Sequence, residues 1–161
     1  MKRTVNEMVI EFREHWKNYV FQSFFATIAI FIISLSLNLK HAIITASLGS
    51  TAFIIFAMPN YLTAKPRNVV GGHIVGLLSG YLANLIPNTT FYADAVIYAF
   101  AVGLSIFIMV VTDTEHPPAS GTALGIAMSG ISLNVITTII ASVIVLSLIR
   151  TLFKAHLKDL T

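Results

Sequence analysis

Residues 113–122 read DTEHPPASGT and lie between two stretches that are otherwise suited only to lipid. Charged groups at membrane depth are costly and are usually kept for a functional reason. The rest of the composition sets the class, because 56% of the 161 residues are apolar, 11% are charged and the mean hydropathy is +0.82. This composition is too apolar for a soluble domain of this length. The chain is predicted to be an all-α integral membrane protein.

The number of crossings follows from the apolar segments, since each crossing needs about 20 apolar residues, or fewer where protein shields the helix. Six segments qualify: 19–37, 42–58, 69–86, 93–111, 118–129 and 133–153. Five crossings are the alternative, in which the short fifth segment enters the membrane and returns. Six crossings from a cytoplasmic N-terminus place every Lys and Arg except Lys40 inside, as the positive-inside rule requires. We therefore expect six helices in the cell (inner or plasma) membrane, with both termini cytoplasmic.

The segment before the first span has helical periodicity of its own. Apolar residues recur at positions that share a helix face, while charged residues occupy the other faces: Val5, Met8, Val9, Phe12 and Trp16 are the apolar set. This pattern is typical of a helix that lies along the membrane surface, and a partner-binding helix is the alternative. The expected organisation is an amphipathic interfacial helix at 1–17, a transmembrane domain at 18–154 and a cytoplasmic tail at 155–161.

Two compositional facts exclude whole classes of function. The chain has no cysteine, so disulfides, thiolate metal sites and cysteine nucleophiles are excluded. The net charge of +3 is explained by Lys and Arg on the inner face, so it does not imply nucleic-acid binding.

An internal repeat is suggested by a shift of 71 residues, which aligns GSTA at 49–52 with SGTA at 120–123. The same shift places the first predicted span over the fourth and the third over the sixth. Three helices per half would make the second half enter from the opposite side, which is the inverted repeat of many transporters. Chance similarity is the alternative, because small residues are common wherever membrane helices pack.

The middle helix of each half is short and is expected to begin with small polar residues: Ser47, Gly49, Ser50 and Thr51 in one half, and Ser120, Gly121 and Thr122 in the other. Broken helices of this kind would aim free N–H groups and positive dipole ends into the membrane, which suits an anion. Alternatively, the hydroxyls bond to their own helices and the glycines serve packing, without any ligand.

Two loops carry further polar residues. Arg67 and Asn68 follow Pro66 at the expected start of the third span, where Arg67 either attracts anions or anchors the chain at the inner face. His73 lies about one turn further on and is a candidate for ligand contact or proton handling, or else a structural histidine. In the second loop, the two prolines after His116 present its ring at the entrance to the fifth segment.

These two loops also carry a resemblance to a known family. The stretch RNVVGGH at 67–73, together with HPPA at 116–119, resembles the HPP family of small integral membrane proteins. The resemblance extends from about the first span to the last. It implies transport, since plant and cyanobacterial members are associated with nitrite movement across membranes. The family motifs fall here on Pro66, Arg67, Asn68, Gly71, Gly72, His73, His116, Pro117, Pro118 and Ala119.

The expected function is a permease or channel for a small inorganic anion, most of all nitrite, bound at helix N-termini near the bilayer midplane. The candidate binding residues are Gly49, Ser50, Thr51, Arg67, Asn68, His73, His116, Ser120, Gly121 and Thr122. Passive conduction and proton coupling both stay open. A membrane scaffold or sensor subunit without transport is the alternative.

An intramembrane enzyme is the weakest reading, because neither a Gly-x-Ser-x-Gly elbow nor a His-Glu-x-x-His metal pair occurs. We expect no catalytic residues, no metal and no cofactor. The expected partners are the anion, the lipid bilayer and further copies of the chain, as a dimer or trimer packed through small residues.

Overall fold

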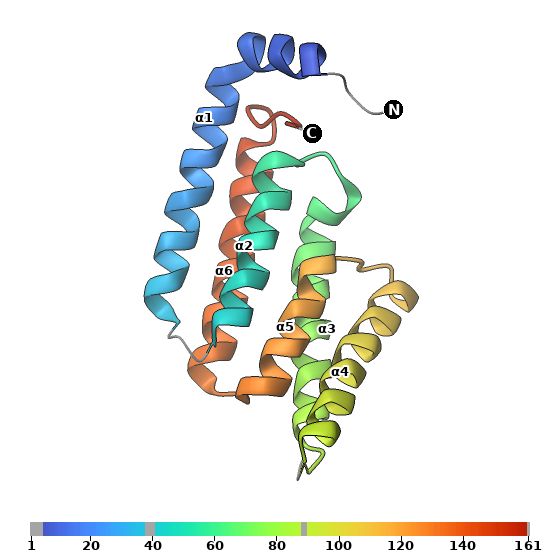
Figure 1. Ribbon diagram of the computed structural model, residues 1–161. Coiled ribbons are helices and arrows are strands. Elements are labelled where there is room, and N and C mark those ends of the chain that lie inside the picture. The colour runs from blue at the N-terminus through green and yellow to red at the C-terminus, as the bar shows by residue number, and fades with distance from the viewer. Residues whose placement is uncertain (1–4, 38–40, 88–89, 161) are drawn as a thin grey trace.

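The computed structural model describes residues 5–37, 41–87 and 90–160. In that part of the chain the structure is helical throughout, with no strand (Figure 1). The elements are α1 (Val5–Ser36), α2 (Ala42–Ala57), the short 3-10 helix η2 (Leu62–Ala64), α3 (Pro66–Asn84), α4 (Phe91–Val111), α5 (Pro117–Ser129) and α6 (Leu133–Phe153). The all-α prediction is confirmed. Lys2, Arg3 and Lys40, which entered the prediction of orientation, lie outside the described residues.

The six α-helices form one bundle in which successive helices run in alternating directions (Figure 1). The start of α1 and the segment after α6 therefore lie at the same end. At the centre, α5 packs against α2, α3 and α4, while α6 packs against α2 and α3. Helix α1 covers α2 from outside, and its first turns are set at an angle to the rest of the helix.

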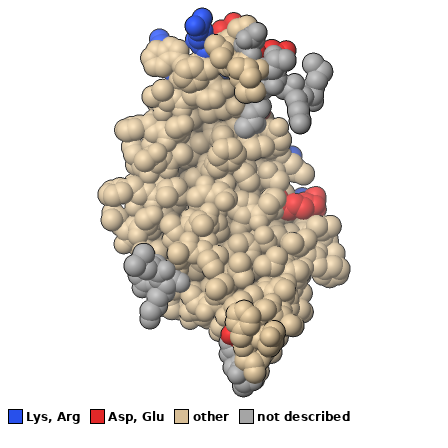
Figure 2. All heavy atoms as spheres, viewed as in Figure 1, with Lys and Arg blue, Asp and Glu red and all other residues tan. Residues whose placement is uncertain are grey.

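The outside of the bundle is suited to lipid. Three helices, spanning Glu7–Ser36, Phe91–Val111 and Leu133–Phe153, are long and apolar enough to cross a membrane. Large apolar side chains such as Phe31 and Phe107 are exposed on them. Figure 2 shows a broad uncharged surface with most charged groups gathered at the end that holds the start of α1. The chain is a membrane protein, and the count of six crossings stays a prediction because α2 and α5 are only 16 and 13 residues long.

Helices α3 and α5 approach each other through a row of glycines on α3. A Cβ atom at Gly80 would lie 2.5 Å from the carbonyl oxygen of Ala123 and 2.7 Å from Cβ of Ile126. A Cβ atom at Gly76 would collide with the carbonyl oxygen of Ala119. Small residues thus bring the two backbones into contact, as is common between membrane helices.

The start and end of α5 follow directly from the sequence. His116 is the N-cap residue, and Pro117 and Pro118 are the first helical residues, where their fixed φ angle suits a helix and their missing N–H groups are not needed. Gly130 ends the helix with a φ of 77°, a conformation that glycine adopts without strain. This short helix is thereby placed with His116 at its entrance.

The segment predicted to be a tail, 155–161, packs back onto the bundle through its described residues 155–160. The Gln22 side chain donates to the Lys158 carbonyl (2.9 Å) and accepts from the Lys158 N–H (3.2 Å). The Leu160 N–H donates to the Ala57 carbonyl at 2.8 Å. Nearby, the buried Arg150 guanidinium donates from both Nε (3.0 Å) and one terminal nitrogen (2.8 Å) to the carbonyl of Pro59. The middle of α1 and the C-terminal ends of α2 and α6 are therefore joined by polar contacts.

Candidate functional site

The centre of the bundle holds a fully buried histidine, His73 on α3. Its two ring nitrogens contact two threonines from different helices. Nε2 lies 2.9 Å from Oγ1 of Thr51 on α2, and Nδ1 lies 2.9 Å from Oγ1 of Thr122 on α5. The imidazole thus bridges the two short helices, and both of its nitrogens have partners.

A second buried histidine, His116, lies beside the first. Its Nδ1–H donates to the carbonyl oxygen of Thr63 in η2 at 2.8 Å, since a carbonyl can only accept. Its Nε2 lies 3.0 Å from the same Thr51 hydroxyl that contacts His73. The two ring centroids are 5.2 Å apart. The Thr51 hydroxyl therefore links the two imidazoles.

Ser47 completes the arrangement from α2. Its hydroxyl donates to the carbonyl oxygen of Pro118 at 2.6 Å and lies 2.9 Å from Oγ1 of Thr122. We call these five side chains the imidazole–hydroxyl cluster: Ser47, Thr51, His73, His116 and Thr122. None of the five is more than 5% exposed.

Glycines make room for the cluster. A Cβ atom at Gly72 would lie 2.7 Å from Cβ of His116 and 3.1 Å from the Thr114 carbonyl oxygen. A Cβ atom at Gly121 would lie 3.3 Å from Cβ of Ser47. The first glycine lets His116 lie against α3, and the second lets α2 bring Ser47 against α5.

Comparison with known protein families covers the whole of the cluster. The family model described as the HPP transmembrane region matches residues 11–159. The chain belongs to the HPP transmembrane family. The match includes all five cluster residues, so the cluster is part of the HPP region of the chain.

The curated relatives of this HPP chain include two transmembrane proteins of Dictyostelium discoideum. One is 36% identical over 92 residues, which is 55% of this chain and 31% of the relative. The other is 39% identical over 83 residues, which is 52% of this chain and 27% of the relative. The aligned region thus spans less than a third of the length of each relative. No solved structure matches the HPP chain.

Of the ten residues predicted to bind the ligand, the structure brings four into the cluster: Thr51, His73, His116 and Thr122. Asn68 lies next to it, where its side-chain amide donates to the Glu115 carbonyl at 3.1 Å and holds the loop before His116. Ser47 was predicted among the small polar residues of the short helix but not among the binding residues. Its position one helical turn before Thr51, on the same face of α2, is the signal that could have identified it.

Three predicted residues on α2 and α5 lie away from the cluster. The Ser50 hydroxyl donates to the Ala46 carbonyl and that of Ser120 to the Pro117 carbonyl, so both bond within their own helices. A Cβ atom at Gly49 would meet nothing within 4 Å. The expectation that α2 begins at these small residues is wrong. The helix begins at Ala42, because residues 42–48 contain no breaker, and Gly49 and Ser50 lie in its middle.

The start of α5 does not present a row of free N–H groups. Pro117 and Pro118 have none, and the Ala119 N–H donates to the His116 carbonyl at 2.8 Å. The hydrogen-bond donors of the cluster are therefore side chains, and its backbone groups only accept. The sequence led us to expect free backbone N–H groups from two helix N-termini. Side chains from α2 and α5 surround His73 instead.

Arg67 lies outside the cluster, at the surface where α3 begins. Its guanidinium is 2.9 Å from the Asp113 carboxylate and donates to the Thr112 carbonyl at 3.0 Å. Both charged side chains are about two-thirds exposed, at 63% and 68%. The ion pair connects the start of α3 to the end of α4, at the same end of the bundle as His116.

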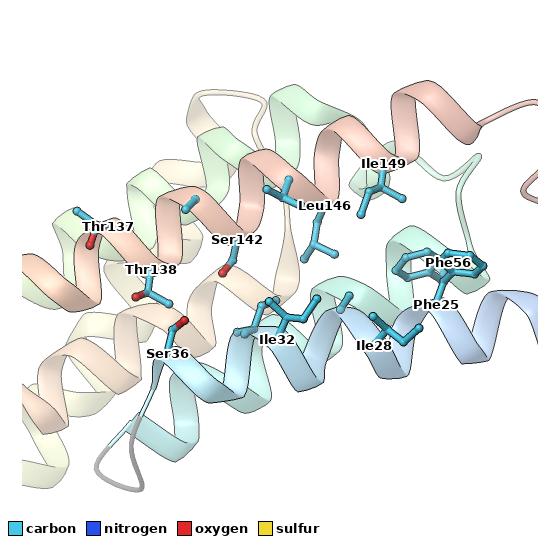
Figure 3. A pocket seen from close by; sticks show the side chains of 14 residues that line it. Phe25, Ile28, Ile32, Ser36, Phe56, Thr137, Thr138, Ser142, Leu146 and Ile149 are labelled. Carbon is cyan, nitrogen blue, oxygen red and sulfur yellow. The ribbon is translucent and has the colours of Figure 1, made fainter.

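A cavity of about 450 Å³ lies between α1 and α6 and is separate from the cluster (Figure 3). Its walls are mostly apolar, with hydroxyls at one end from Ser36, Thr137, Thr138 and Ser142. No cluster residue lines it. Among the described residues, no group of three His, Asp or Glu side chains is placed to hold a metal ion.

Proposed function

We propose that this HPP-family protein is a permease or channel for a small inorganic anion, with nitrite as the leading substrate. The observation that carries the proposal is the buried imidazole–hydroxyl cluster inside a bundle whose outer surface is apolar. Intramembrane polar and ionisable groups at this depth are characteristic of substrate or ion pathways. None of the five side chains is acidic, so the cluster carries no group that repels an anion.

The chemistry of the cluster is suited to replacing the hydration of a small anion. Hydroxyl and imidazole groups can each donate a hydrogen bond, and such donors offset the cost of removing the anion from water. In this proposal the anion is bound by the side chains of Thr51, His73, His116 and Thr122 instead of by helix N-termini. Since all four side chains are buried, the anion reaches them only when the helices separate.

The inverted repeat is part of the proposal. Thr51 and Thr122 are matched by the 71-residue shift, and they contact opposite ring nitrogens of His73. Two pairs of matched helices also pack together, α2 with α5 and α3 with α6. These contacts support a two-fold arrangement around the cluster, of the kind that lets transporters open alternately to each side.

We also propose the location, the oligomeric state and a role for the surface charges of the protein. The protein resides in the cell membrane with both termini in the cytoplasm, and it forms a dimer or trimer. Arg67, with Lys65 nearby in the chain, lies where the loops meet the surface and raises the local concentration of anions.

The test is nitrite uptake by liposomes that contain the purified protein, with chloride, nitrate and formate as competitors. We expect saturable uptake that is lost in His73→Leu and Thr51→Val. Ser50→Ala is the matched control, because Ser50 is next to Thr51 but bonds only within α2. Circular dichroism and gel filtration check that each variant is folded. If the folded wild type transports none of the four anions, the transport proposal is refuted and the scaffold or sensor subunit is favoured.

A further inference from the structure

The cluster forms an unbroken chain of hydrogen-bond contacts that ends on a backbone carbonyl at both sides. The order is Thr63 carbonyl, His116, Thr51, His73, Thr122, Ser47 and Pro118 carbonyl, joined by six contacts of 2.6–3.0 Å. Every contact of this length needs one proton between its two atoms. Because the terminal carbonyls only accept, all six protons must come from the five side chains.

The neutral side chains supply too few protons. Three hydroxyls and two neutral imidazoles carry one N–H or O–H proton each, which gives five protons for six contacts. Thr51 also lies 3.1 Å from the Ser47 carbonyl, which only increases the demand. In the neutral state, at least one contact would therefore bring two lone pairs together at hydrogen-bonding distance.

We propose that the cluster is a proton-binding site, which holds one additional proton as an imidazolium shared by His73 and His116. The direction of each hydrogen bond then follows from the two terminal carbonyls. His116 Nδ1–H donates to the Thr63 carbonyl, and His73 Nδ1–H donates to Thr122. Thr122 in turn donates to Ser47, and Ser47 donates to the Pro118 carbonyl. All six contacts then have a donor.

Thr51 lets the proton pass between the two rings. Its hydroxyl accepts from Nε2–H of the charged ring and donates to Nε2 of the neutral ring. In transfer from His116 to His73, the N–H bond of His116 breaks and its proton bonds to the Thr51 oxygen. At the same time the original Thr51 O–H bond breaks, and that proton bonds to Nε2 of His73. Both end states contain the same number of hydrogen bonds.

Other charged groups around the cluster lie at its loop end. Helix α2 contributes no ionisable residue within Ala42–Ala57. Arg67 at the start of α3 is paired with Asp113 after α4, and Lys65 before α3 is exposed. On α6, Arg150 is bound to the Pro59 carbonyl.

Glu115 directly precedes His116, and its Oε2 atom is buried without a hydrogen-bond partner among the described residues.

The proton site has a consequence for transport that rests on the proposed function. A positive charge at the cluster attracts the anion, and a proton that moves with the anion would couple nitrite uptake to the pH gradient. The proton content itself can be measured without any flux. Failure of nitrite transport would therefore leave the proton site standing, and failure of the proton site would leave passive anion conduction standing.

The experiment is nitrogen NMR of ¹⁵N-histidine-labelled full-length protein in lipid nanodiscs between pH 5 and pH 8. His15, His41 and His156 are replaced by Asn, so that the remaining signals come from His73 and His116. We expect imidazolium character amounting to one charge over the two rings at pH 6. Two neutral rings over the whole pH range, in folded protein, would overturn the proposal.

Two variants that each remove one hydroxyl test the count of protons against contacts. Thr122→Val and Ser47→Ala each remove one proton and two contacts, so four protons serve four contacts and the neutral form has no shortage. The ratio of charged to neutral imidazole should fall about tenfold or more at a given pH, since the neutral form is relieved of the contact that lacks a proton. Ser50→Ala, which lies outside the chain of contacts, should keep the wild-type ratio. A wild-type ratio in both folded deletion variants would overturn the proposal.

Discussion

Replacement of Gly80 by alanine tests how α3 and α5 fit together. The new Cβ atom would lie 2.5 Å from the Ala123 carbonyl oxygen and 2.7 Å from Ile126 Cβ, well inside the usual contact distance. One neighbour is backbone, so the clash is relieved only if the helices move apart. Overpacking of this kind costs about 1–3 kcal/mol, whereas the higher helix propensity of alanine recovers at most about 1 kcal/mol. Subtracting about 1 kcal/mol from this cost leaves an expected net loss of about 0–2 kcal/mol in the free energy of unfolding.

Gly103→Ala is the matched control, because Gly103 is in the interior of α4 and its added Cβ would meet nothing within 4 Å. This variant should equal the wild type or exceed it by up to about 1 kcal/mol. The assay is reversible denaturant unfolding in detergent micelles, followed by circular dichroism. Equal stabilities for Gly80→Ala and Gly103→Ala would refute the inference that backbone contact sets the distance between α3 and α5.

Three further predictions concern the surface and the packed end of the chain. Arg150→Met leaves the buried Pro59 carbonyl without its donors and should lower the unfolding free energy by about 1.5–3 kcal/mol, while the exposed Lys154→Met should change it by less than about 0.5 kcal/mol. Gln22→Leu removes the contacts to Lys158 and should speed proteolysis near Lys158 about tenfold, whereas Thr27→Val, whose hydroxyl bonds within α1, should not. Arg67→Gln should change stability by less than about 1 kcal/mol because its ion pair is exposed, yet should lower nitrite uptake several-fold at low salt and less at high salt. Unchanged low-salt uptake in that variant would argue against electrostatic attraction at this surface.

The helices were largely predictable because hydropathy and helix-breaking residues mark them. The predicted segment 133–153 coincides with α6, and the predicted segment 118–129 differs from α5 by one residue. The third predicted segment, 69–86, begins three residues late, because Pro66 is itself the first residue of α3. Proline is favoured at that position, so turn chemistry located this boundary better than hydropathy did.

The types of residue in the candidate site were predictable from the sequence, but the helix face on which each residue lies was not. Thr51 and Ser50 are neighbours of similar polarity, yet successive helical residues point about 100° apart, and only Thr51 points to His73. Apolar periodicity does not reveal the inner face of a helix whose outer face meets lipid. A serine or threonine on the outer face bonds to its own helix, as Ser50 does, and gives no sign of its position. Packing between helices therefore decides which hydroxyls meet.

The backbone contact between α3 and α5 also has a consequence for motion within the bundle, because it joins these two helices closely. His73 and Thr122 belong to this closely fitted pair, whereas Ser47 and Thr51 belong to α2. A displacement of α2 would break the four contacts from α2 to the pair and would keep the bond between His73 and Thr122. In the proposed transport, α2 is therefore the helix that we expect to move, released when the hydroxyl groups of Ser47 and Thr51 lose these contacts.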